Sequence, residues 1–245
     1  MDIRVYKDIE ELSKEAARLF EYLSKERDGG RNGGCRRPFT VALSGGSTPK
    51  VLYSMLASAP YREDIAWKDT VIFFGDERLV ARDSGESNYR MVSENLLMNI
   101  DIPAENIHAI EEELPPKESA ELYEKKIKGV FKSLGDESPV LDLVLLGLGT
   151  DGHTLSIFPG SPALHERDKL VVGVDDGPKD TNKRVSMTFP LINNAKNIVV
   201  LVSGESKAEA LRDVLKGRDE RLPASLIEPK GHLIYLIDEA AASLL

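Results

Sequence analysis

The sequence predicts an α/β protein in which a mostly parallel sheet carries helices on both faces. The first observation is a set of short Val, Ile and Leu runs without strict apolar and polar alternation, which is typical of strands covered on both faces. The second is that amphipathic helical patterns separate these runs along the chain. Strands that alternate with helices favour parallel pairing.

Each element follows from its local pattern. The N-terminal residues 1–23 predict a short strand and an amphipathic helix. Buried strands are predicted at 39–44, 70–75, 140–147, 169–174, 197–204 and 232–238. Helices are predicted at 49–58, 87–99 and 205–217. The charged segment 111–139 predicts a helix with a solvated face and an apolar stripe of Leu122, Ile127, Val130 and Phe131. The Gly/Arg stretch 28–37 predicts a mobile surface loop.

Size and charge limit the classes of partner. A chain of 245 residues with 41% apolar residues suits a single domain over residues 1–245. Lys and Arg number 32 and Asp and Glu 41, so the formal charge is 32 − 41 = −9. An acidic chain has no general attraction for nucleic acid or anionic membranes, so an anionic ligand needs a local positive pocket.

The remaining composition indicates a cytoplasmic protein. The lone Cys35 excludes an internal disulfide. No apolar run approaches the roughly 18 residues that span a membrane, and the N-terminus does not resemble a signal peptide.

The segment VALSGGSTPKVLY predicts a strand that enters a loop and then a helix. Two glycines allow the backbone to expose N–H groups, hydroxyls add donors, and the helix N-terminus adds positive partial charge. The predicted phosphate loop is Ser44, Gly45, Gly46, Ser47 and Thr48. An ordinary strand-to-helix turn with a Ser or Thr cap is the alternative interpretation.

The segment FFGDERLV places charges after an apolar strand. Asp76, Glu77 and Arg78 follow that strand at its carboxyl end, where ligands bind in open α/β sheets. The alternative is a surface turn in which Glu77 pairs with Arg78.

The segment LGLGTDGHT contains Gly147, Gly149 and Gly152 after a strand, in the spacing G-x-G-x-x-G. A dinucleotide site is rejected because prolines soon interrupt the following stretch and no long helix can form there. We expect the glycines to build a tight loop that presents Asp151 and His153.

His153 is the best candidate for a general acid/base, because it lies in that loop beside an acid. His108, His165 and His232 have no neighbouring chemistry and are taken as structural or solvated. Without a close His, Cys and acid cluster or an H-E-x-x-H motif, we expect neither a metal nor a cofactor.

Two basic residues lie near predicted strand ends, as further phosphate ligands should. They are Arg184, which opens RVSMTFPLINNA, and Lys207, at the start of the helix after NIVVLVSG.

Taken in chain order, these motifs resemble the 6-phosphogluconolactonases of the glucosamine-6-phosphate isomerase/6-phosphogluconolactonase family. The matching segments are SGGSTP, GDER with SNY, GLGTDGHTLSIFPGS, RVSMTFPLINNA and SGESKAEAL. The resemblance implies a Rossmann-like α/β sandwich with a small appended lobe, as in glucosamine-6-phosphate deaminases and ribose-5-phosphate isomerases. Leu155 and Ala81 depart from the family pattern, where a small residue and a proline are usual.

The resemblance also implies a reaction, the hydrolysis of 6-phospho-D-glucono-1,5-lactone to 6-phosphogluconate in the oxidative pentose phosphate pathway. It implies that the Ser44–Thr48 loop, Arg184 and Lys207 hold the substrate phosphate, and that Asp76 also binds substrate. The residues implied to face the lactone are Arg78, Asp151 and His153.

Two rival functions remain open. One is an aldose-ketose isomerase of the deaminase type, although the deaminases carry an Asn-Glu-Pro segment where this chain has residues 157–160, Ile-Phe-Pro-Gly. The other is a non-catalytic sugar-phosphate sensor, although the chain lacks a helix-turn-helix segment or a basic arm. For assembly we expect a monomer or a weak homo-oligomer.

Overall fold

The computed structural model describes residues 1–26, 37–175 and 183–245. Seven parallel strands form the main sheet in the order β1-β10-β9-β6-β2-β3-β5, and a second, antiparallel sheet has the order β4-β8-β7. The strands are β1 (Asp2–Tyr6), β2 (Phe39–Leu43), β3 (Thr70–Phe74), β4 (Asp76–Arg78), β5 (Ile107–His108), β6 (Leu143–Gly147), β7 (Val171–Val174), β8 (Arg184–Met187), β9 (Asn197–Val202) and β10 (His232–Asp238). The α-helices are α1 (Ile9–Lys25), α2 (Ser47–Leu56), α3 (Tyr61–Asp64), α4 (Asn88–Asn95), α5 (Pro116–Ser133), α6 (Phe189–Ile192) and α7 (Ala208–Leu215).

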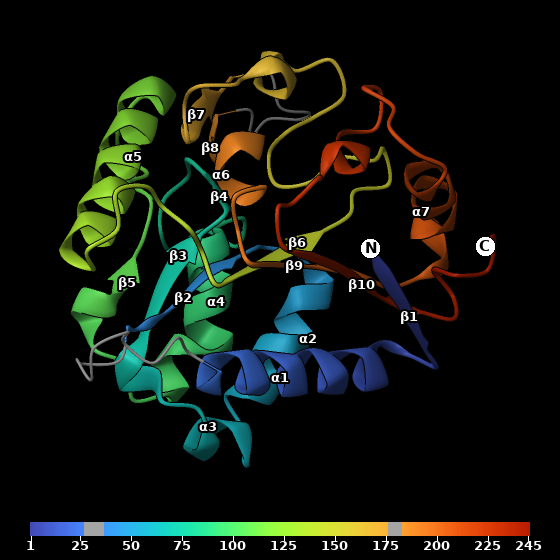
Figure 1. The fold of residues 1–245 in the computed structure, drawn as a ribbon, viewed down its shortest axis with the longest axis horizontal. Helices are drawn as coiled ribbons and strands as arrows, with labels where there is room; N and C mark the ends of the chain where they lie inside the picture. Colours follow the sequence, from blue (N-terminus) through green and yellow to red (C-terminus); the bar gives the residue numbers. More distant parts are fainter. Residues whose placement is uncertain (27–36, 176–182) are drawn as a thin grey trace.

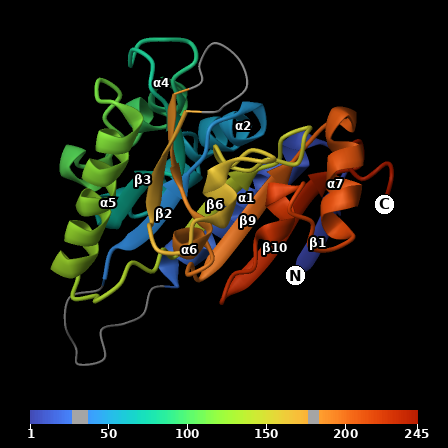
Figure 2. The same ribbon diagram turned by 90° about the horizontal axis from the view of Figure 1, so that it is seen from above.

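The helices cover both faces of the main sheet. In Figure 1, α1 and α2 lie below the sheet and α6 and α7 lie above it. Figure 2 shows α5 at one end of the molecule and α7 at the other, with the strands of the main sheet between them. None of the helices in the described ranges has both the length and the apolar composition that a bilayer crossing requires.

Local sequence accounts for the main elements. Every residue of β2 and β3 is buried, as their uninterrupted apolar runs require. Helix α1 begins after Asp8, whose carboxylate accepts hydrogen bonds from the backbone N–H groups of Glu10 and Glu11. The buried side of α1 includes Leu12 and Phe20, and the Phe20 ring meets the core ring of Phe39 edge-on at 5.4 Å.

The predicted α/β class is confirmed, and so are the predicted strands that form β1, β2, β3, β6, β9 and β10, whereas the short β5 was not predicted. Two details are wrong. The run 169–174 forms a strand, but β7 pairs antiparallel with β8 in the second sheet, and its other neighbour is α5. In α5, Ile127 and Phe131 are buried as predicted, whereas Leu122 is 40% exposed and Tyr123 turns inward instead. The loop predicted at 28–37 lies outside the described residues, except for Arg37.

The order of the strands leaves the carboxyl ends of two neighbouring strands uncovered by helices. From β2 the chain moves to β3 on one side, whereas from β6 it continues to β9 on the other side. Right-handed crossovers then place the following helices on opposite faces. The carboxyl ends of β2 and β6, which are neighbours in the sheet, are therefore left open between two loops.

His108 on β5 provides a test of this packing. Its ring stacks on Phe73 with centroids 5.0 Å apart, and burial together with the charge of Lys126 lowers its pKa from 6.5 to about 4. As the pH falls from about 6.5 to about 4, the unfolded chain takes up a proton that the folded chain refuses. The folded protein therefore loses stability in that window.

We predict that His108→Phe keeps the stack and removes this loss. Because solvent screens the partly exposed ring, the expected difference in the free energy of unfolding is about 1 to 2 kcal/mol between pH 6.5 and 4. Urea unfolding of both proteins across this range measures it. Parallel pH profiles would contradict the prediction.

Candidate functional site

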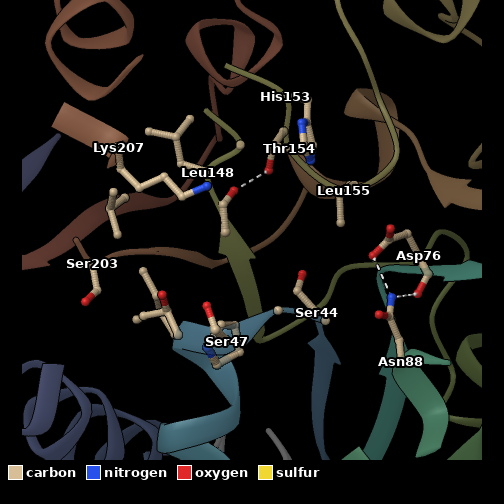
Figure 3. Close-up of a pocket in the computed structure, with 18 of the residues that line it drawn as sticks. Ser44, Ser47, Asp76, Asn88, Leu148, His153, Thr154, Leu155, Ser203 and Lys207 are labelled. Atoms are coloured by element: carbon tan, nitrogen blue, oxygen red, sulfur yellow. Dashed lines mark hydrogen bonds between the residues drawn. The ribbon is translucent and has the colours of Figure 1, made fainter. Parts of the chain in front are cut away.

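A pocket lies where β2 and β6 end, at the gap between the two loops (Figure 3). It brings together residues from the loop after β2, from β4 and β8, from the loop after β6, and from the start of α7. Ten of the eleven predicted site residues line it, namely Ser44, Gly45, Gly46, Ser47, Thr48, Asp76, Arg78, His153, Arg184 and Lys207. Asp151 is the exception.

The loop after β2 is held rigidly. The Tyr53 hydroxyl donates a hydrogen bond to the Ser44 carbonyl at 2.8 Å and accepts one from the Ser44 N–H at 3.1 Å. The Ser44 hydroxyl donates to the Leu145 carbonyl at 2.7 Å, so it holds the loop to β6 instead of offering a free donor as expected. Gly46 has φ +112, a conformation that favours glycine, and precedes α2.

The first turn of α2 opens toward the pocket. No side chain caps this end of the helix, and Ser47 and Thr48 of its first turn line the pocket. N–H groups at a helix start carry positive partial charge and bind anions well. This loop can therefore donate several hydrogen bonds to one small anion.

The three charges after β3 have different surroundings. Asp76 is 6% exposed and accepts a hydrogen bond from the Ser156 hydroxyl at 2.6 Å. The Arg78 guanidinium donates to the Glu86 carbonyl at 2.9 Å and to Asn88 Oδ1 at 3.0 Å. Glu77 points away from the pocket and is 3% exposed, so the alternative of a salt-bridged surface turn is wrong.

Glu77 holds the start of α4. Its carboxylate accepts hydrogen bonds from the backbone N–H groups of Arg78 at 2.8 Å, Asn88 at 2.8 Å and Tyr89 at 2.7 Å. Burial raises the pKa of Glu77 to about 7, and the charge of Asp76 adds to this rise while the three N–H groups oppose it.

Asn88 is a pocket residue to which the sequence analysis gave no role. Its side-chain amide donates to the Asp76 carbonyl at 3.0 Å and to Asp76 Oδ1 at 3.3 Å (Figure 3). A Cβ atom on Gly45 would lie 1.9 Å from Asn88 Oδ1, so this close approach explains the glycine. The signal available in the sequence was its place directly after Ser87, which caps α4.

The loop after β6 presents His153. The Gly149 N–H donates to the His153 carbonyl at 2.8 Å, and a Cβ atom on Gly149 would lie 2.1 Å from His153 Nδ1. That nitrogen is 2.5 Å from Asp151 Oδ1, and the ring contacts Phe158 with centroids 4.8 Å apart. Nε2 has no hydrogen-bond partner among the described residues, so it is free to contact a ligand in the pocket.

Asp151 lies behind the imidazole. Partial burial acts to raise the pKa of Asp151, but the hydrogen bonds and charge of His153 outweigh it and lower the pKa below its ordinary value. A carboxylate at Nδ1 favours the tautomer with the proton on that nitrogen. Nε2 is then the basic nitrogen.

Two cations in the pocket have no hydrogen-bond or ion-pair partner in the described part of the chain. Arg184 is 8% exposed, and its guanidinium lies over the Phe158 ring, 5.3 Å from the centroid. Its pKa is lowered by burial and by the charge of Arg78, its cross-strand neighbour, although nearby carboxylates oppose this. Burial also lowers the pKa of Lys207, against the charge of Asp151. Unpaired cations in a pocket favour a bound anion.

Of the two departures from the family pattern, only Leu155 affects the pocket. It lines the pocket, is 7% exposed and has φ +54, which is uncommon for a residue other than glycine. A Cβ atom on Gly75 would lie 2.7 Å from its Cδ2 atom. Ala81 is exposed and does not line the pocket. Among the described residues, no group of three or more His, Cys, Asp or Glu side chains is placed to hold a metal ion.

The fold and the pocket define an α/β protein with unpaired cations beside a histidine–carboxylate pair, at the point of the sheet where the winding changes direction between β2 and β6. Residues 7–235 match the model of the family described as "Glucosamine-6-phosphate isomerases/6-phosphogluconolactonase". The chain belongs to this family.

Relatives and solved structures agree with this assignment. The chain is 42% identical to a 6-phosphogluconolactonase of Nostoc sp. over 208 residues, covering 84% of each chain. It is 41% identical to the Homo sapiens 6-phosphogluconolactonase over 218 residues, 86% of this chain and 83% of the human one. The structure of 6-phosphogluconolactonase from Trypanosoma cruzi is similar with a TM-score of 0.84 and 33% identity, covering 100% of this chain and 96% of that one. A monomeric glucosamine-6-phosphate deaminase is similar with a TM-score of 0.81 and 27% identity, covering 100% of both chains.

We predict that His153→Ala raises the pKa of Asp151, because the variant removes the ring hydrogen bond and the ring charge that hold this pKa down. Carbon-13 NMR titration of the aspartate carboxyl groups measures the change. Asp213 is the internal control, since Arg212 and Lys216 hold its pKa low and neither residue is altered. An Asp151 titration identical in both proteins would show that the contact with His153 does not form in solution.

Proposed function

We propose that this protein hydrolyses 6-phospho-D-glucono-1,5-lactone to 6-phosphogluconate. The observation that carries the proposal is that two unpaired cations, Arg184 and Lys207, share one pocket with the His153–Asp151 pair. Such a pocket can hold the phosphate of a small ligand and place a base next to another part of the same ligand. The names of the relatives support this particular lactone.

In this proposal, the substrate phosphate binds to the first turn of α2 and to the two cations. Backbone N–H groups at the helix start and the hydroxyls of Ser47 and Thr48 donate to phosphate oxygens, while Arg184 and Lys207 supply charge-assisted hydrogen bonds. Gly45 and Gly46 let the backbone approach the anion, and Ser44 anchors the loop.

The lactone end lies at His153. Nε2 of the neutral ring takes a proton from water as the water oxygen bonds to C1, and Asp151 stabilises the imidazolium that forms. The bond between C1 and the ring oxygen then breaks, and the proton passes to that oxygen. Arg78 stabilises the negative charge on the carbonyl oxygen, and Asp76 binds a sugar hydroxyl. The proposed reaction uses no metal or cofactor.

Wild-type protein should hydrolyse the lactone faster than it opens spontaneously. A coupled assay tests this by generating fresh lactone with glucose-6-phosphate dehydrogenase and following acid release. A rate equal to that without the protein would exclude the proposed reaction.

His153→Ala should lower kcat by about 10²- to 10⁴-fold, because it removes the proposed base. Binding of 6-phosphogluconate, measured by calorimetry, should be nearly unchanged because the phosphate contacts remain. A variant that turns over at close to the wild-type rate would remove His153 from the reaction.

Arg184→Ala and Lys207→Ala should chiefly raise KM, by about 10- to 100-fold, since each removes a charge-assisted hydrogen bond to the phosphate. Lys216→Ala is the matched control, because this lysine directly follows α7, is exposed and pairs with Asp213. Unchanged KM values in both test variants would refute the phosphate assignment.

A deaminase-type isomerase is the second candidate, because a monomeric glucosamine-6-phosphate deaminase has a similar structure. The stretch 157–160 supplies no carboxylate for that chemistry. Incubation with glucosamine 6-phosphate should therefore release no ammonia, and ammonia release at a rate matching lactone hydrolysis would favour the second candidate.

The proposed setting is the cytoplasm, with a sugar phosphate as the small-molecule ligand. A net charge of −9 gives no general attraction for nucleic acid or anionic membranes, so we propose neither as a partner. For the assembly, we propose a monomer or a weak homo-oligomer.

A further inference from the structure

The pairing of β4 with β8 does not explain why the Arg78 side chain stays in the pocket. Arg78 lies opposite Arg184 in the β4–β8 register, so two guanidinium groups project from neighbouring strands. Their charges repel each other, and the charge of Arg78 contributes to the lowered pKa of Arg184. An arginine on a short strand with 29% of its side chain exposed could relieve this repulsion by turning to solvent. Something must hold it in place.

Asn88 supplies the side-chain hydrogen bond that does so. Its Oδ1 accepts from Arg78 Nη1 at 3.0 Å, and Asn88 is 4% exposed. The other contacts of the guanidinium are with Glu86, through a backbone carbonyl at 2.9 Å and a looser carboxylate contact at 3.5 Å. The Glu86 side chain is 59% exposed and 3.5 Å away, so of the two side chains Glu86 is the weaker anchor.

Asn88 is itself fixed by Glu77. Asn88 is the first residue of α4. The Glu77 carboxylate accepts hydrogen bonds from the backbone N–H groups of Asn88 and Tyr89. Ser87 adds a hydroxyl contact to the same carboxylate at 3.3 Å. A buried carboxylate at a helix start pairs with the positive end of the helix dipole, so the first turn cannot rotate freely.

The Asn88 side chain is also confined by its neighbours. Its Oδ1 occupies the space beside Gly45, and its amide donates to Asp76. Asp76 has a second, shorter anchor in Ser156 at 2.6 Å and does not depend on Asn88 alone. Arg78 has no such buried side-chain anchor besides Asn88 among the described residues, since its other contacts are with the backbone carbonyl and the exposed carboxylate of Glu86.

We propose that Glu77 and Asn88 form one positioning unit that holds the Arg78 guanidinium in the pocket, against the repulsion of Arg184. Neither is a catalytic residue. Glu77 acts on the Arg78 guanidinium through Asn88, and it also fixes the Arg78 backbone, whose N–H donates to the Glu77 carboxylate at 2.8 Å. The effect on turnover rests on the proposed function, in which Arg78 stabilises the carbonyl oxygen. The positioning of Arg78 does not rest on it.

The first test does not use activity. Phenylglyoxal modifies accessible arginines, and mass spectrometry measures the rate at each one. Asn88→Ala and Glu77→Gln should each raise the rate at Arg78 several-fold and leave it unchanged at Arg212, an arginine on α7 far along the chain. An unchanged rate at Arg78 in both variants would overturn the proposal, whether or not the protein hydrolyses the lactone.

The second test is a double-mutant cycle with Arg78→Ala. Asn88→Ala should lower kcat about tenfold when Arg78 is present and less than about twofold when it is absent. Glu77→Gln should add little to Asn88→Ala, because both act on the same group. Equal losses with and without Arg78 would overturn the proposal, as they would show a general effect on folding.

Matched variants separate positioning from stability. Glu94→Gln changes another glutamate of α4, one that pairs with Arg90 at the surface, and should keep both the wild-type kcat and the wild-type labelling of Arg78. Asn88→Ser replaces Asn88→Ala if the latter does not fold, because the shorter side chain cannot reach Arg78. Absence of lactone hydrolysis in the wild type would refute the proposed function alone, since the labelling result would still decide the positioning.

Discussion

The site depends on a change in the direction of sheet winding between the parallel strands β2 and β6. These strands lie side by side in the sheet, yet the chain leaves them toward opposite faces. No single helix can then cover both carboxyl ends, so the two loops stand apart and leave a pocket between them. Every group assigned to the site reaches it from a strand end or a helix start around this opening.

The pocket contains cations that lack a hydrogen-bond or ion-pair partner among the described residues, while the groups that support it are paired. Around it, buried polar groups have partners: Tyr53 holds the loop before α2, Glu77 holds the start of α4, and Ser156 holds Asp76. In the pocket, the Arg184 guanidinium and the Lys207 ammonium have none among the described residues. Leaving a buried cation unpaired is costly, and a bound anion removes that cost.

In the His153–Asp151 pair, too, one ring nitrogen is held by a protein group and the other is free. Gly149 brings the backbone close enough for the loop to close on itself, and Asp151 occupies one ring nitrogen. The other nitrogen is left for the pocket. In the proposed reaction, a base whose orientation is fixed before the substrate binds would lose little freedom.

Much of this could be predicted from the sequence because the relevant signals are local. Uninterrupted apolar runs gave the buried strands of the main sheet, and the glycines near Ser47 and Asp151 indicated tight loops at strand ends. Pairing partners are not local, so the strand at 171–174 was assigned to the wrong sheet, and Leu122 to the buried face of α5. The role of Glu77 was missed for the same reason. Its carboxylate accepts hydrogen bonds from two N–H groups of α4 that are eleven and twelve residues away in the chain.

The sequence by itself determined which residue types stand at the strand ends and, through the spacing of apolar residues, the α/β class. The tertiary structure decided which of those residues share a pocket and which only support it. The sequence does not show how Arg78, Asn88 and Arg184 are arranged, because Arg78 and Arg184 are over a hundred residues apart and Asn88 meets Arg78 only across a turn. Whether a charged group is paired or free depends on neighbours that only the tertiary structure brings together, and the proposed chemistry rests on the unpaired groups.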